Sequence, residues 1–175
     1  MPSPARRAVL AAALLFAIGP TSASAGVCWA DCMAAGLGPV DSDRPIRELA
    51  RACRTACDER ARDIASRLGV AGKLSACRPQ PLTPDEFRQL RAANPSFRLQ
   101  TGVFSWEITN VFSAKALVRV EFANHDAGSA EQVFTSGGLI LPGTTGTFVI
   151  PAVTDSYPFG HFTGRVVEVA ACDLH

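Results

Sequence analysis

The sequence predicts an α+β chain, with a disulfide-linked helical hairpin and a short helix first and an antiparallel β-sandwich of about five to seven strands after them. Three observations support this prediction. The first half has an apolar stripe at helical spacing, the second half alternates apolar and polar residues, and six cysteines are spread over both. The expected segments are a signal peptide (1–25), the hairpin (26–76), a linker with a short helix (77–96) and the sandwich (97–175).

The first 25 residues are expected to be a cleaved secretory signal. Arg6 and Arg7 precede an apolar run over residues 8–18, and Ala23-Ser24-Ala25 has the small-residue pattern of a cleavage site. The apolar run is too short to cross a hydrocarbon core of about 30 Å as a helix. We therefore expect a periplasmic or secreted protein with no membrane span in the mature chain.

Charge separates the two halves of the mature chain. Residues 26–100 carry 12 basic and 9 acidic side chains, whereas residues 101–175 carry 3 basic and 7 acidic ones. The mature chain as a whole is nearly neutral, which argues against a general nucleic-acid binder. Most aromatic residues lie in the second half, and together these shifts indicate two structural units.

The segment 42–69 gives the clearest helix signal. Ser42 or Asp43 can cap it, Pro45 suits its first turn, and Gly69 is a typical terminator. Its charged residues include Arg47, Arg51, Arg54, Asp58, Glu59, Arg62 and Asp63, which predict a solvated face, with an anion-binding surface as the weaker alternative. Its least polar residues follow steps of three and four: Ile46, Ala50, Cys53, Cys57, Ala61, Ile64 and Leu68.

Two shorter helices flank this one. The alanine-rich segment 26–35 predicts a brief helix that ends before Gly36. Thr83, Pro84 and Glu86 form the capping-box pattern of a second helix, which ends at Asn94-Pro95.

Beyond residue 97 the pattern changes to strands and turns. Alternating side chains predict five strands, in the segments GVFSWEITNVF, KALVRVEFA, EQVFTS, GTFVIPA and HFTGRVVEVAAC. Over about 70 residues this succession resembles the immunoglobulin-like sandwiches common in secreted bacterial proteins, a resemblance that implies a fold and no activity.

The six cysteines are predicted to form disulfides, because an even number in an exported chain is typical of a disulfide framework. Residues four apart lie on one helical face. Two antiparallel helices joined by a turn near 36–41 would then pair their cysteines in nested order. The predicted bridges are Cys28–Cys57, Cys32–Cys53 and, by elimination, Cys77–Cys172.

The two C-x3-C pairs resemble the twin C-x3-C helical hairpins of the mitochondrial intermembrane-space chaperones. The resemblance rests on Cys28, Cys32, Cys53 and Cys57 alone, and it implies the hairpin geometry. Two alternatives for these cysteines are a four-cysteine zinc site and a redox-active pair. Both are weaker, because structural zinc more often uses C-x2-C and thiol oxidoreductases use C-x-x-C at a helix start.

Little else in the sequence points to chemistry. His125, His161 and His175 are scattered, and no serine-nucleophile elbow or phosphate-binding loop is present. The aromatic segment around Tyr157, Phe159, His161 and Phe162 is the best candidate for a binding loop.

We therefore expect an exported, non-enzymatic protein with no cofactor and no bound metal, which acts through contacts with a protein partner that the sequence does not identify. The alternative is a metal-handling protein, or an enzyme whose site is assembled from dispersed residues.

Overall fold

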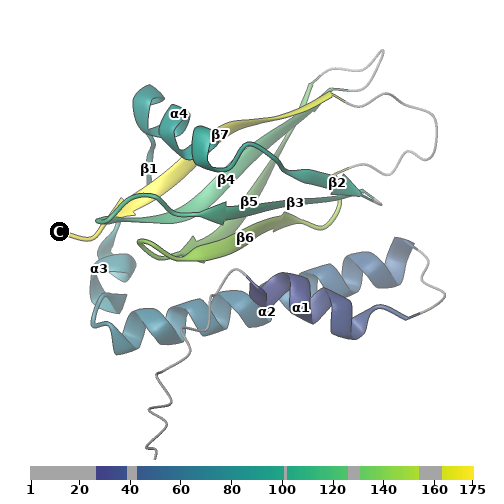
Figure 1. The fold of residues 1–175 in the computed structure, drawn as a ribbon, viewed down its shortest axis with the longest axis horizontal. Helices are drawn as coiled ribbons and strands as arrows, with labels where there is room; N and C mark the ends of the chain where they lie inside the picture. Colours follow the sequence, from purple (N-terminus) through teal and green to yellow (C-terminus); the bar gives the residue numbers. More distant parts are fainter. Residues whose placement is uncertain (1–26, 39–42, 101, 126–130, 154–162) are drawn as a thin grey trace, which may run out of the picture.

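The computed structural model describes residues 27–38, 43–100, 102–125, 131–153 and 163–175. It confirms an α+β chain in which helices are followed by antiparallel sheets (Figure 1). The helices are α1 (Val27–Gly36), α2 (Asp43–Arg67), α3 (Ala71–Ala76) and α4 (Pro84–Ala93). The strands are β1 (Gln80–Pro81), β2 (Arg98–Gln100), β3 (Val103–Thr109), β4 (Lys115–His125), β5 (Gln132–Ile140), β6 (Thr145–Ile150) and β7 (Thr163–Asp173). The expected signal segment lies outside the described residues.

Two disulfides join α1 to α2 in the predicted nested order. Cys28 pairs with Cys57 and Cys32 with Cys53, and the Cα atoms of the two pairs are 5.9 and 5.6 Å apart. The helical hairpin is therefore confirmed, and α2 ends where expected, because Gly69 adopts a left-handed φ of 71°.

The short helix α3 was not predicted from the sequence. It lies between α2 and Cys77, and none of its residues is buried. Two contacts attach this region to the end of β7: the Cys77–Cys172 disulfide, and a hydrogen bond of 2.7 Å that the Lys73 Nζ donates to the Leu174 carbonyl. The third predicted bridge thus connects the helical part of the chain to a sheet.

The strands form two antiparallel sheets. One has the order β1-β7-β4-β5 and the other β2-β3-β6. The sheets are open, and the immunoglobulin-like sandwich stays a prediction. The helix α4 begins with the predicted capping box, in which Thr83 and Glu86 bond reciprocally.

The largest core cluster combines residues from both sheets and from α4. Its fully buried members include Phe104, Trp106, Phe122 and Phe148, with Leu90 of α4. A hydrogen bond of 3.2 Å from the Trp106 indole N–H to the Asn94 carbonyl fixes the end of α4 against β3. This core positions β5 and β6, on whose outer side α2 lies.

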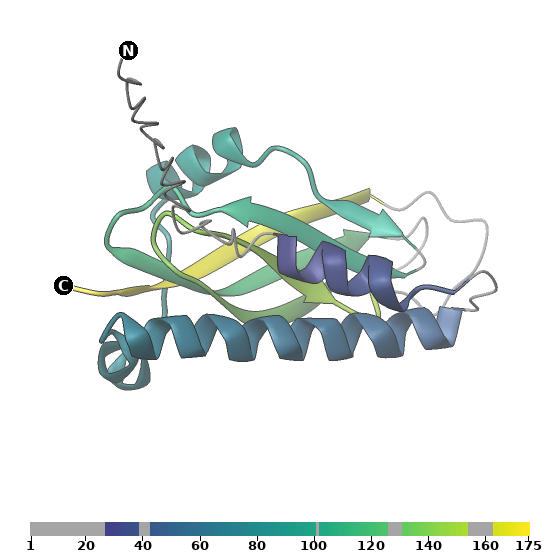
Figure 2. The same ribbon diagram turned by 60° about the horizontal axis from the view of Figure 1, so that its bottom comes forward.

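The helical hairpin covers the outer side of the three-stranded sheet, opposite α4 (Figures 1 and 2). Val103 and Val149 pack there against Met33, Ala50 and Cys53. Alternation along the strand puts Val103 on the same side as Glu107 and Thr109, yet the structure buries Val103. The reason is that α1 and α2 cover the second face of β3, so alternation alone does not separate a core face from a solvent face.

Candidate functional site

The most distinctive surface of the described chain is the side of α2 that faces away from α1. Five arginines follow one another there at steps of three, four, three and eight residues, with Asp58 inside the longest step. We call this surface the arginine face: Arg44, Arg47, Arg51, Arg54 and Arg62. Three hollows lie along it, one of them lined by Arg44, Arg47, Glu48 and Arg51, and one narrow crevice lies beneath it.

The sheet sets the position of the arginine face. The Arg54 side chain is only about a third exposed and lies over β5, where its Nη2 atom would be 3.8 Å from a Cβ at Gly137. At Gly138 a Cβ would be 2.9 Å from the buried ring of Phe148 and 3.5 Å from the Asp58 carboxylate. A side chain at Gly138 would therefore clash with Phe148 of β6, whereas Arg54 and Asp58 of α2 lie at ordinary van der Waals distance from this strand.

Asp58 is the one acidic residue in the middle of the arginine face. Its side chain is 15% exposed, and its Oδ2 atom is 3.6 Å from the Arg54 Nε. Burial raises the pKa of the Asp58 carboxyl above its ordinary value, and the Arg54 and Arg62 guanidinium groups offset this only in part. The arginines thus surround a carboxylate that is poorly solvated.

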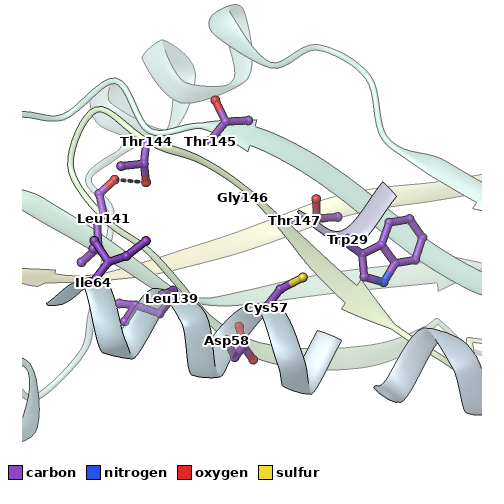
Figure 3. A pocket seen from close by; sticks show the side chains of 11 residues that line it. Trp29, Cys57, Asp58, Ile64, Leu139, Leu141, Thr144, Thr145, Gly146 and Thr147 are labelled. Carbon is purple, nitrogen blue, oxygen red and sulfur yellow. Dashed lines mark hydrogen bonds between the residues drawn. The ribbon is translucent and has the colours of Figure 1, made fainter. Parts of the chain in front are cut away.

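The crevice beneath α2 is small. Figure 3 shows Asp58 and Ile64 on α2 opposite the segment that joins β5 to β6, where the Thr144 hydroxyl donates a hydrogen bond of 2.9 Å to the Leu141 carbonyl. Its volume of about 30 Å³ is enough for one or two water molecules and too small for a substrate. This crevice is therefore a packing gap and is not a catalytic pocket.

Two of the three hollows share Arg62. The basic hollow, of about 360 Å³, is lined by Arg51, Arg54, Thr55, Asp58 and Arg62. The apolar hollow, of about 420 Å³, lies next to it between α2, α3 and the strands β4 and β5. Its lining is Arg62, Ala65, Ser66, Ala71, Leu74, Ser75, Val118, Gly138 and Leu139. Together they form a surface that is cationic at one end and apolar at the other.

Arg51 and Arg62 are the accessible charges of this surface. Both side chains are exposed, and neither forms an ion pair within the described part of the chain. Arg44, in contrast, pairs with Glu48 at 3.1 Å. An external anion can therefore bind Arg51 and Arg62 without breaking an ion pair within the described part of the chain.

The cysteines are all oxidised. All six form disulfides and none is free, so the structure contains no thiolate for zinc binding. Among the described residues, no group of three or more His, Cys, Asp or Glu side chains could hold a metal ion. His125 and His175 are exposed and lie at the ends of β4 and of the chain.

The predicted binding loop with Tyr157, Phe159, His161 and Phe162 lies outside the described residues and stays a prediction. The arginine face, in contrast, was predicted as the solvated side of a helix, with an anion-binding surface as the weaker alternative. The spacing of its arginines is visible in the sequence, but the apolar hollow exists only because β4, β5 and α3 lie beside α2.

No protein-family model, curated protein or solved structure matches the chain. In the part of the chain that the structure describes, no helix has the length and apolar character needed to cross a membrane.

Proposed function

We propose that the protein is an exported, disulfide-stabilised binding protein that acts through protein–protein contacts, and that the arginine face with its basic and apolar hollows is the contact surface. The observation that carries the proposal is the continuity of the basic and apolar hollows through Arg62. A cationic surface that adjoins an apolar one is the combination that protein interfaces use, with charge for orientation and apolar contact for affinity.

The disulfides support the exported location. Three bridges and no free cysteine are typical of proteins that mature in an oxidising compartment, such as the periplasm or the extracellular space. Two of these bridges hold α2, the helix that carries the arginine face. A rigid helix presents its side chains to a partner with less loss of conformational entropy than a mobile one.

The test compares two double variants that remove the same charge. Arg51→Ser/Arg62→Ser changes the arginine face. Arg60→Ser/Arg88→Ser instead removes Arg60, which lies on the other side of α2 from Arg51, and Arg88, which lies on α4. Each tagged protein is crosslinked in the natively exported state and purified, and its mass is then measured by light scattering.

The wild type and the Arg60/Arg88 variant should retain the same stoichiometric protein partner, and the Arg51/Arg62 variant should lose it. Retention of that partner by all three proteins, or the absence of any protein complex in the wild type, would contradict the proposal. Circular dichroism checks that both variants keep the helical content of the wild type.

A further inference from the structure

The two hollows differ in chemistry, and this difference restricts what can occupy them together. The basic hollow has three arginines against one carboxylate, and that carboxylate is poorly solvated. The apolar hollow offers Leu74, Val118 and Leu139 with small residues around them. An occupant that satisfies both surfaces must therefore carry negative charge at one end and an apolar group at the other.

We propose that these hollows bind an acidic, extended peptide segment of another exported protein, with carboxylates over the arginine face and an apolar side chain in the apolar hollow. This inference rests on the proposed function and adds the chemistry of the partner. Charge complementarity is the main argument, because Arg51 and Arg62 are exposed cations without an ion pair among the described residues.

The length of the peptide follows from helix geometry. Arg51 and Arg62 are eleven positions apart on α2, which corresponds to about 16 Å along the helix axis. An extended chain advances about 3.3 Å per residue, so about five residues span this distance. Because alternate side chains of an extended peptide point the same way, carboxylates at every second position can face the arginines.

The apolar side chain follows directly after the acidic residues, because Arg62 lines both hollows. The occupant we infer is therefore a segment of three alternating acidic residues followed, within about two residues, by a large apolar residue. The recessed position of Arg54 and Asp58 between α2 and β5 favours a narrow chain over a flat anionic lipid surface. A nucleic acid is disfavoured, because the whole chain carries a formal charge of only +1.

The experiment uses fluorescence anisotropy with the oxidised full mature chain. The probe is a labelled peptide with glutamates at alternate positions followed by phenylalanine. The comparison peptides replace the glutamates by glutamine or the phenylalanine by serine. Binding of the probe should be saturable with one peptide per chain, should weaken with added salt, and should be weaker for both comparison peptides.

Variants then test each hollow separately. Arg51→Ser/Arg62→Ser should weaken probe binding by about tenfold, since each exposed charge pair contributes about threefold. Ala71→Trp places a large side chain at an exposed position in the lining of the apolar hollow and should also weaken binding. The matched controls, Arg60→Ser/Arg88→Ser and Ala92→Trp on α4, should bind the probe like the wild type.

Three results would overturn the inference: no saturable binding of the probe, equal binding of the glutamine peptide, or equal binding by the Arg51/Arg62 variant. Arginine-dependent binding to vesicles of anionic phospholipid without binding of the peptide would assign the arginine face to a membrane surface instead. If the native protein partner is captured in an arginine-dependent manner while the peptide fails to bind, only this inference is wrong and the proposed function stands.

Discussion

Removing the Cys77–Cys172 disulfide should cost more stability than removing the inner bridge of the hairpin. The Cys77–Cys172 bridge joins residues 95 positions apart, whereas Cys32 and Cys53 are 21 positions apart. A disulfide stabilises mainly by limiting the unfolded chain, so its effect grows with the logarithm of the loop that it closes. In the chain-entropy model the longer loop corresponds to about 4.7 kcal/mol and the shorter one to about 3.3 kcal/mol.

The nested order reduces the contribution of the inner bridge further. When Cys28–Cys57 is already closed, Cys32–Cys53 closes only the small ring made by the two C-x3-C spacers. A ring of about eight residues corresponds to about 2.5 kcal/mol, so the two double variants should differ by about 2 kcal/mol. Packing contributes similarly to both, because Cys53 and Cys172 are each buried and their partners are each half-buried.

The assay is urea-induced unfolding of the oxidised variants Cys77→Ala/Cys172→Ala and Cys32→Ala/Cys53→Ala, followed by tryptophan fluorescence and evaluated by linear extrapolation. Thiol titration first verifies that the four remaining cysteines are paired. The Cys77/Cys172 variant should also show the larger dependence on urea, because its unfolded chain is less restricted. An equal or larger loss of stability in the Cys32/Cys53 variant would refute the chain-entropy reasoning for this protein.

Three further substitutions test other parts of the structure, each by urea unfolding. Burial raises the pKa of the Asp58 carboxyl, so the folded protein holds this proton more tightly than the unfolded chain does. Ionised Asp58 therefore lowers the stability of the fold, and Asp58→Asn should be more stable than the wild type at pH 7. This difference in stability should vanish below about pH 4, where the carboxyl is protonated in both states. A wild type that is more stable at pH 7 would contradict this. Thr83→Ala removes the cap of α4 and should cost about 1 kcal/mol, whereas no loss would mean that the capping box contributes nothing. Gly164→Ala places a Cβ 2.2 Å from the buried ring of Phe122 and should cost about 1–3 kcal/mol. Its control, Gly72→Ala in open space on α3, should be neutral or stabilising, and equal losses in both would reject the steric explanation.

The features that the sequence predicted correctly are those set by local spacing. The nested bridges follow from two C-x3-C pairs on facing helices, and the start of α4 follows from the Thr83 capping box. Both signals lie within a few residues, where helix geometry alone decides which side chains meet. The third bridge was predicted by elimination. In the structure it joins Cys77, directly after α3, to Cys172 near the end of β7.

The features that the sequence did not predict depend on contacts between distant segments. Val103 is buried because the helical hairpin lies on the outer side of β3, and nothing near Val103 in the sequence indicates this. Likewise, α3 has no buried residue, and the structure holds it by contacts to Cys172 and Leu174 at the far end of the chain. The apolar hollow is likewise formed by distant segments, because Val118 of β4 and Leu139 of β5 lie far along the chain from the α2 residues that they adjoin.

The disulfides and the arginine face can be understood as parts of one arrangement. The buried residues of α2 are Ala50, Cys53 and Ala65, which are all small and bury little apolar area for a helix of 25 residues. The larger residues of the apolar stripe, Ile46, Leu49 and Ile64, are only partly buried. Two covalent links to α1 therefore supply part of what a larger core would contribute. Because the cross-links hold α2 in place, the positions next to this stripe are free to carry charge. If the arginine face binds as proposed, the C-x3-C pairs contribute to binding indirectly, because they hold an arginine-rich helix rigidly against β5 and β6.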